Sequence, residues 1–474
     1  MLRTHSANVL LFSIIWILAA VMTLPAQTTD VADNSPIAPN TTGTDAGMTS
    51  DPQQPSPAAA VVQQPVKPTV LPDEEYPAWA TYDANGPGLT LGRGDWGLVT
   101  LSGYAVMRYI NQLPANATFP DHLGNIHRID ARNDIEFHRA MLHFRGWLMD
   151  RKFRYQVTVW SVLSTNQTTL YGFGGYQFNK KFNAYAGINT LGGSRSLMGS
   201  HPYWLANDRV LADEFFRPGF TGTAWVNGEP IPGLWYMVAA GNSLSQLGFT
   251  AKQLSRDIGT GQTVWWMPTT KEFGPAGSYS DWEYHEKLAT RFGVSNYRAR
   301  ENRFNQNAAP GADNYQVKLA DSIQLFDTGS LAKDVTVINA TVRGFAADAG
   351  LKYHGIFLQT EFYNRWISDF DADGPLPVSN LHDWGFYVQA AFFPVKKRLE
   401  VYGVTSWIYG DKSAGFGNSH EWMQGANYYP YDTRNIRLNI QMIEIDRSPQ
   451  SSLFGFYVGG QKGVTVSTAL SFAF

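Results

Sequence analysis

Hydrophobic and polar residues alternate one by one through residues 463–474, GVTVSTALSFAF. Val464, Val466, Leu470 and Phe472 fall on one parity, and mostly small or polar residues fall on the other. This period of two predicts a β-strand with one apolar face and one polar face. Such a strand fits the wall of a closed membrane barrel, although the last strand of an ordinary β-sandwich has the same pattern.

The same alternation recurs along most of the chain. Strands are expected at residues 98–110, 139–148, 153–160, 170–178, 182–189, 234–240, 335–346, 352–365, 386–395 and 399–409. Short and long connections between them broadly alternate, which is typical of barrels with tight turns at one end and loops at the other. The sequence therefore predicts an all-β fold, a transmembrane antiparallel β-barrel of about 16 strands, or up to roughly 18 if strands are missed.

Composition supports a barrel over a bundle of membrane helices. Hydrophobic residues make up 44% of the chain, aromatic residues 14% and charged residues 16%. The mean hydropathy of −0.25 is too polar for a helical bundle, whereas aromatic girdles account for the many aromatic residues of a barrel. A net charge of −3 gives no indication of nucleic-acid binding. The chain has no cysteine, which excludes disulfides, thiolate metal sites and a lipoprotein anchor.

The first residues have the composition of a secretory signal. Arg3 precedes an apolar run, and the small residue Ala26 precedes polar Gln27, so we predict a cleaved signal peptide at 1–26, the alternative being an uncleaved anchor helix. Residues 27–89 are mostly rich in Pro, Thr and Ala and are predicted to be a disordered periplasmic tether. Residues 90–474 form the predicted barrel domain. Secretion and a barrel together predict the outer membrane of a Gram-negative bacterium.

Basic side chains recur on the polar parity of the predicted strands and are expected to line the pore. These residues are Arg108, Arg139, His143, Arg145, Arg154, Arg343 and Arg365. A fixed positive field inside a water-filled pore raises the local concentration of anions, so the pattern favours an anion preference. The alternative is that many of these arginines pair with acids such as Glu361 and only stabilise the wall.

One long connection, residues 190–232, carries both signs of charge and several aromatic residues. Its charged residues are Arg195, Asp208, Arg209, Asp213, Glu214 and Arg217. A loop of this length inside a compact fold is usually functional, and we expect it to fold into the lumen and narrow it. The alternatives are a surface loop facing lipopolysaccharide, or a latch between subunits of a trimer.

Signals for metal binding and catalysis are weak. Asp369, Asp371 and Asp373 alternate before a glycine, as at the start of a calcium loop, but the position where that loop has Glu is occupied by Asn380. The segment HEKLATR at 285–291 contains a single His, and no nucleophile-elbow or phosphate-loop motif is present. We therefore expect no enzyme activity, no cofactor and no bound metal.

Two stretches resemble the phosphate-selective porin O/P family of Gram-negative outer membranes. HRAMLHFRGWLMDRKFRYQVTVW (138–160) is similar to an arginine-bearing strand pair of that family, and NYYPYDTRNIRLNIQM (427–442) is similar to its late hairpin. The terminal Phe474 matches the aromatic residue that barrel-assembly machinery reads. The resemblance implies a sixteen-stranded trimeric barrel with an inward-folded third loop that conducts anions, phosphate among them. Its arginine motif is matched by Arg139 and Arg145, but the 190–232 loop has no lysine.

The predicted function is that of an outer-membrane porin. It would pass small hydrophilic solutes, anionic or neutral, by diffusion, with a modest preference for anions. The expected partners are outer-membrane lipid and lipopolysaccharide, the assembly machinery through Phe474, and two further copies in a homotrimer. The alternative is a non-conducting barrel that serves as a structural anchor or adhesin.

Overall fold

The computed structural model describes residues 88–162, 167–197, 203–245, 257–274, 278–306, 316–451 and 455–474. The predicted signal peptide and nearly all of the predicted tether lie outside these residues, and Leu89, the last residue of the predicted tether, begins strand β1 (Leu89–Gly94). Within the described residues no helix is long and apolar enough to cross a membrane.

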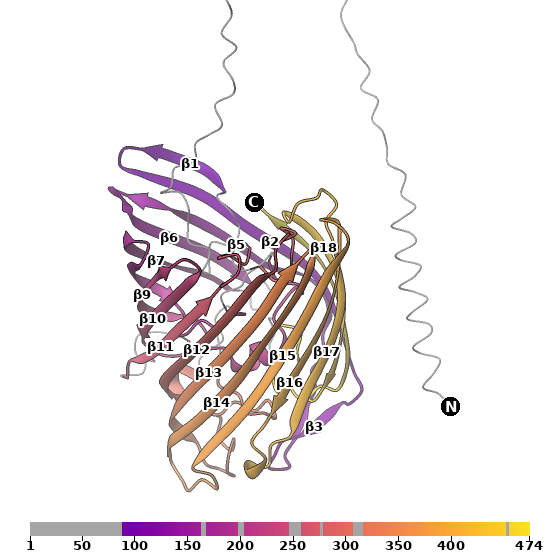
Figure 1. Ribbon diagram of the computed structural model, residues 1–474. Coiled ribbons are helices and arrows are strands. Elements are labelled where there is room, and N and C mark those ends of the chain that lie inside the picture. The colour runs from indigo at the N-terminus through magenta and orange to yellow at the C-terminus, as the bar shows by residue number, and fades with distance from the viewer. Residues whose placement is uncertain are drawn as a thin grey trace, which may run out of the picture. The chain divides into compact units, whose positions relative to one another are not determined.

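Seventeen antiparallel strands of the described residues form one sheet, and sixteen of them close into a barrel (Figure 1). The first eight are β2 (Gly97–Pro114), β5 (Asn133–Leu148), β6 (Asp150–Val162), β7 (Gln167–Asn179), β8 (Phe182–Asn189), β9 (Thr221–Ile231), β10 (Leu234–Gly241) and β11 (Gly259–Trp266). The other eight are β12 (Ala289–Asn302), β13 (Val337–Tyr353), β14 (Ile356–Ala372), β15 (Asn380–Val395), β16 (Leu399–Tyr409), β17 (Asn418–Tyr428), β18 (Ile436–Asp446) and β19 (Gly463–Ala473). The predicted fold class is confirmed, although the alternation missed β9, β11, β12, β17 and β18.

The barrel closes where its first and last strands meet. β19 pairs with β2 from Gly463 opposite Pro114 to Ala473 opposite Tyr104. β1 pairs with the part of β2 that extends past this seam, from Leu101 to Gly97. The β1–β2 hairpin therefore projects beyond the rim, at the end of the barrel where the C-terminus lies (Figure 1).

The two ends of the barrel differ in their connections. At the end with the C-terminus, most connections are tight, such as residues 149, 180–181, 232–233, 354–355 and 396–398. The opposite end carries longer connections, including 190–220, 303–336 and 447–462, and the small hairpin β3 (Thr118–Pro120) and β4 (Ile126–Arg128). We call these the turn end and the loop end. Short helical segments, α2 (Leu211–Phe216), α3 (Arg303–Gln306) and η5 (Lys412–Ala414), occur in the loop-end connections.

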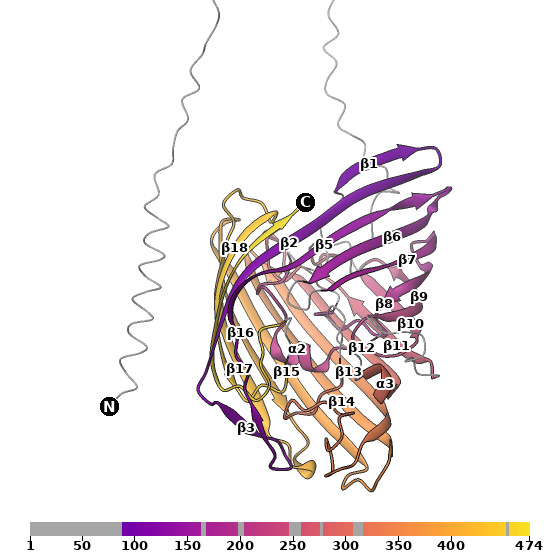
Figure 2. The same cartoon turned by 180° about the vertical axis from the view of Figure 1, so that it is seen from behind.

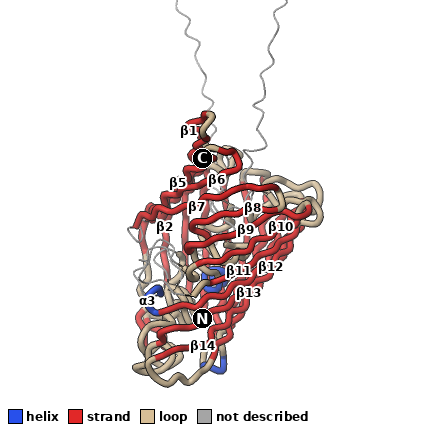
Figure 3. Tube along the Cα trace, turned by 90° about the vertical axis from the view of Figure 1, so that its left-hand side faces the viewer, coloured by secondary structure: helices blue, strands red, loops and turns tan. Residues whose placement is uncertain are grey.

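Period-two alternation places one set of side chains on each face of the wall. On β2, Thr100, Ser102 and Arg108 are buried inside, whereas Met107 is 47% exposed on the outside. The same inside and outside alternation holds along the other long strands, such as β12 and β16. Figure 2 shows α2 lying inside the barrel, and Figure 3 shows the tilted strands of the wall on the side of β5–β14.

Candidate functional site: a loop across the barrel interior

The interior of the barrel is packed. Six of the seven predicted wall residues lie on the inner face, and none of them exposes more than 4% of its surface: Arg108, Arg139, His143, Arg145, Arg154 and Arg365. Their direction follows the predicted alternation, but they contact protein groups instead of facing a wide water-filled channel. The alternation sets the direction in which a side chain points, whereas its surroundings depend on the connections that fold inward.

Arg343 does not lie on the inner face, so its prediction as a pore-lining residue was wrong. Its side chain is 44% exposed on the outer face of β13, where it forms an ion pair with Asp369 at 3.3 Å. The inner face of β13 is formed at this level by Val342 and Gly344, which have the opposite parity. These inward residues are small or apolar because the inward-folded segments pack against them, so polarity alone did not reveal the parity of the strand.

The predicted 190–232 loop is shorter than expected. Its last part is strand β9, which pairs with β8 and β10, so the loop proper runs from Thr190 to Phe220. Gly, Pro and Asn residues in β9 disguised the strand, since these residue types usually indicate turns. All six predicted loop charges still fall within the shorter loop.

One side of the loop is held by inward-facing groups of β14, β16 and β17. Glu361 on β14 accepts hydrogen bonds from the backbone N–H groups of Arg195 (2.7 Å) and Ser196 (3.2 Å). Glu421 on β17 accepts from the N–H of Leu211 at 2.9 Å. Glu421 therefore pairs with an N–H group at the start of α2 that has no partner within that helix. Glu361 instead holds the backbone near the start of the loop, before α2.

The other side of the loop is held by β2 and β5. The Asp208 carboxylate lies 2.5 Å from Nη2 of Arg139, 3.3 Å from Nε2 of His138 and 3.7 Å from Nη1 of Arg108. Burial alone would raise the pKa of Asp208, but the charges of Arg139, His138 and Arg108 together hold it well below its usual range. Asp208 is thus a permanent carboxylate in this setting.

These contacts show that the loop crosses the lumen. Going around the wall from β5 to β14, eight strands lie between them in one direction and six in the other, so the two strands are nearly opposite. The Asp208 contact on β5 and the Arg195 contact on β14 therefore bind one loop to opposite walls. The loop divides the interior at this level.

The charges of the loop are mostly paired within the loop itself. Nη1 of Arg209 lies 2.9 Å from Asp213, and Nη2 of Arg217 lies 3.2 Å from Glu214. The Arg195 guanidinium lies 4.0 Å from the centre of the Tyr279 ring, a cation–π contact. The structure thus places Arg195, Asp208, Arg209 and Asp213 in the interior, as a network of opposite charges.

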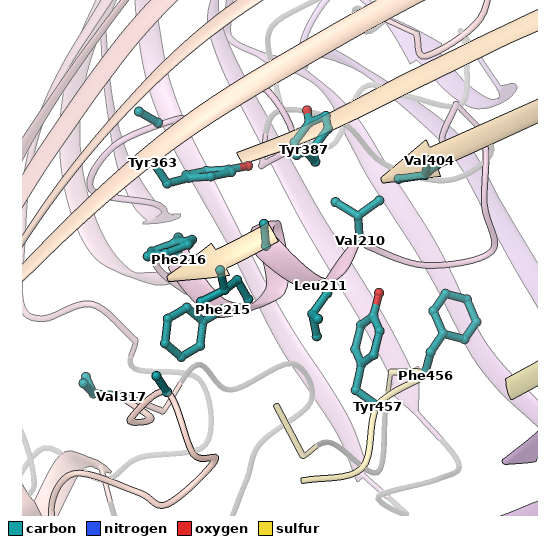
Figure 4. Close-up of a cluster of buried hydrophobic side chains, with 14 of the residues drawn as sticks. Val210, Leu211, Phe215, Phe216, Val317, Tyr363, Tyr387, Val404, Phe456 and Tyr457 are labelled. Carbon is teal, nitrogen blue, oxygen red and sulfur yellow. The ribbon is translucent and has the colours of Figure 1, made fainter. Parts of the chain in front are cut away.

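The part of the loop that forms α2 presents apolar side chains to its surroundings. Figure 4 shows Phe216 of α2 beside Tyr363, whereas Leu211 and Phe215 lie on the opposite side of the helix. The rings of Phe216 and Tyr363 stack with centroids 5.3 Å apart. Phe456 and Tyr457, from the connection between β18 and β19, close the cluster, and the hydroxyl of Tyr457 donates to Glu421 at 2.7 Å. Burial of this apolar surface fixes the helix against the wall.

A second segment, which was not predicted from the sequence, enters the interior from the turn end. The connection between β11 and β12, residues 267–288, is long although it lies at the end with tight turns. Ser278 accepts a hydrogen bond at its carbonyl from Arg195 (3.2 Å), and the N–H of Tyr279 donates to the carbonyl of Tyr203 (2.9 Å). The segment therefore meets the crossing loop inside the barrel. The signal available in the sequence was the length of this connection, which is unusual for the end of the barrel with tight turns.

The calcium-loop candidate does not form a cluster of ligands. Asp369 and Asp371 lie near the end of strand β14, at an irregularity where Asp369 has a φ of 54°. Asp369 pairs with Arg343, Asp371 accepts from Asn339, and Asp373 accepts from the N–H of Thr336. The three carboxylates thus have different partners, whereas those of a calcium loop surround one ion.

Among the described residues one other group has metal-ligand types close together: Asp281, Glu283 and His285. Its carboxylates already have protein partners. Asp281 accepts from the N–H of Gly355 at 2.7 Å, and Glu283 lies 3.4 Å from Arg434. We therefore assign no metal there.

Comparison with known proteins supports the fold. No family model matches the sequence, and no curated protein matches it either. Among solved structures, outer-membrane expressed OmpT of Vibrio cholerae aligns with 81% of this chain and 99% of its own, with a TM-score of 0.51 and 11% identity. The anion-selective porin from Comamonas acidovorans aligns with 80% of this chain and 100% of its own, with a TM-score of 0.48 and 13% identity. At such identities, the match to OmpT shows a shared barrel fold.

Proposed function

We propose that this protein is an outer-membrane channel that passes small hydrophilic solutes, with a preference for anions. The observation that carries the proposal is a closed barrel whose outside is apolar and whose inside is charged and crossed by a loop. A soluble barrel has no use for an apolar outer face, whereas a membrane barrel requires one.

The outer face has the dimensions of a membrane belt. On β13, the outward residues from Tyr353 to Phe345 are apolar, and the first outward charge is Arg343. Tyr353 and Arg343 are ten positions apart along the strand. This corresponds to about 25 Å along the barrel axis for a strand tilted by about 40°. This matches the apolar band of outer-membrane barrels, which is about 25 Å tall.

The anion preference is supported by an uneven distribution of charge inside. Arg108, Arg139, Arg145 and Arg154 lie on three neighbouring strands, β2, β5 and β6. Inward carboxylates outnumber the inward bases Arg291, Lys352 and Arg365 on β12–β17; these carboxylates are Glu301, Asp348, Glu361, Asp383, Glu400 and Glu421. An anion passing on the β2–β6 side of the crossing loop meets a positive wall, which lowers its electrostatic barrier.

The test is the reversal potential of the refolded full chain in a planar bilayer with a salt gradient. We expect an anion-biased potential that moves toward zero in Arg145→Gln and in Arg154→Gln. Arg343→Gln is the matched control, because it removes the same charge from the outer face, and it should leave the potential unchanged. Equal shifts in all three variants would mean that inner arginines do not set selectivity.

Phosphate is the anion suggested by the resemblance of the late hairpin to the phosphate-selective porin O/P family. Added phosphate should then block the chloride current of the wild-type channel more strongly than added sulfate does. Indifference to phosphate would leave a general porin. A homotrimer, recognition of Phe474 by assembly machinery and contact with lipopolysaccharide remain predictions of the same proposal.

A second candidate is the non-conducting barrel that acts as an anchor or adhesin. The observation that favours it is the burial of the inward wall residues together with the entry of segments from both ends. A refolded barrel that inserts into the bilayer but gives no current steps would support this candidate over the channel.

A further inference from the structure

A row of basic and aromatic side chains runs across the outer face near the loop end. Arg298 on β12 lies opposite Arg343 on β13, Arg343 opposite Trp366 on β14, and Trp366 opposite His382 on β15. We call these four residues the outer row. Because they are register partners, they form one line across four neighbouring strands.

The side chains of the outer row point away from the barrel. Arg298 is exposed and Trp366 is 39% exposed, whereas Ala299 and Ile367, next to them in sequence, are buried inside. The rings of Trp366 and His382 stack in parallel, with centroids 5.1 Å apart. The row therefore places two guanidinium groups beside a pair of parallel aromatic rings.

Within the described residues, the positive charge of the row exceeds the negative charge around it. Like charges directly opposite each other on neighbouring strands are destabilising, and Arg300 adds a third positive charge two residues along β12. Asp369 lies 3.3 Å from Arg343, and Asp257 lies 4.0 Å from Arg300. In the described part of the chain, Arg298 has no ion pair or hydrogen bond. Two acids thus face three arginines.

The position of the row relative to the apolar belt indicates which chemical groups it can bind. Arg343 lies at the loop-end edge of the apolar belt, and the aromatic residues Trp384 and Tyr409 stack nearby at 4.0 Å. Arginine on the lipid face is costly at the centre of a bilayer but tolerated at its interface, where aromatic girdles also lie. The groups available at that level are lipid headgroups.

We propose that the outer row binds the phosphate of a phosphorylated glycolipid headgroup in the outer leaflet. Arg298 and Arg343 donate to the phosphate oxygens, since guanidinium groups match phosphate geometry. The stacked Trp366 and His382 pack against the sugar face of the same headgroup. This inference rests on the outer-membrane placement proposed above.

The test compares two lipids on the refolded full chain in nanodiscs. We expect bisphosphorylated lipid A to bind at least about tenfold more tightly than the same lipid with its phosphates removed. The double variant Arg298→Gln, Arg343→Gln should lose this difference. Arg398→Gln is the matched control, because Arg398 is an exposed arginine paired with Asp432 at the opposite end of the barrel, and it should bind as wild type does.

The outcomes separate this inference from the proposed function. A barrel that fails to insert into lipid overturns both. A barrel that inserts and conducts, but whose double variant still prefers the phosphorylated lipid, overturns the outer row alone. Displacement of the lipid by millimolar inorganic phosphate would also overturn it, because the row would then be a site for the free anion.

Discussion

Arg343 and Arg365 are neighbours on paired strands, yet they occupy opposite environments. Arg343 is opposite Trp366, and the next residue along β14, Arg365, is opposite Gly344. Arg365 is fully buried and lies 2.7 Å from Asp383, whereas the Arg343–Asp369 pair is about half exposed. A step of one residue along a strand thus moves an arginine from the packed interior to the exposed outer face of the barrel. The same residue type is structural in one place and available to a ligand in the other.

The largest expected difference follows from removing the acid of each pair. Asp383→Ala leaves a buried guanidinium without its carboxylate and should cost about 3–5 kcal/mol of unfolding free energy. Asp369→Ala removes the partner of an exposed arginine and should cost less than about 1 kcal/mol. Guanidinium-induced unfolding of the refolded barrel, followed by tryptophan fluorescence, measures both. Equal losses would mean that Arg365 is satisfied by the carbonyls of Phe215 and Lys318 alone.

The next effect concerns the hold of the crossing loop on the β5 wall. Asp208→Asn removes the charge that meets Arg139, His138 and Arg108, so the loop should loosen on that side and the single-channel conductance should rise several-fold. Glu214→Gln is the control, because the ion pair of Glu214 is with Arg217 inside the same loop. An unchanged conductance in Asp208→Asn would show that the apolar side chains of α2 alone hold the loop.

The smallest effect concerns pH. We expect the single-channel conductance not to change between pH 7 and 4. The folded pKa of Asp208 is depressed, so its stabilising contact is fully present above the unfolded pKa of about 3.9 and is lost only as pH falls toward the folded value. The Asp208 contact should therefore hold, and wild-type conductance should stay constant, down to about pH 4. A rise near pH 6 would point to another group that holds the loop, such as Glu421.

Much of the fold was predictable because alternation is a local property of the chain. The inner and outer faces of β2, β5 and β6 follow directly from period-two patterns with clear polarity. β13 was harder, since Val342, Gly344 and Ala346 on its inside are no more polar than Phe345 and Ala347 on its outside. β9 was missed because its glycines and proline indicate turns.

The candidate site was only partly predictable. The length and charge of the 190–232 stretch indicated an inward loop, but its anchors come from strands far away in sequence, such as Glu361 and Glu421. The entry of residues 267–288 from the turn end depends on three-dimensional packing that no local pattern contains. Buried inward arginines follow from these segments, so the packed interior could not be inferred from strand parity.

The seam between β2 and β19 has a consequence for how the barrel assembles. Every other neighbouring pair of wall strands is consecutive along the chain apart from the small β3–β4 hairpin and β1, whereas the seam joins strands from opposite ends of the barrel sequence. Contacts of such large sequence separation form late, because closing a long loop costs conformational entropy before any contact offsets it. Until closure, β2 and β19 each present an unpaired edge that another chain can pair with. The slow step of refolding should therefore be seam closure, and aggregation should compete with it more strongly as protein concentration rises.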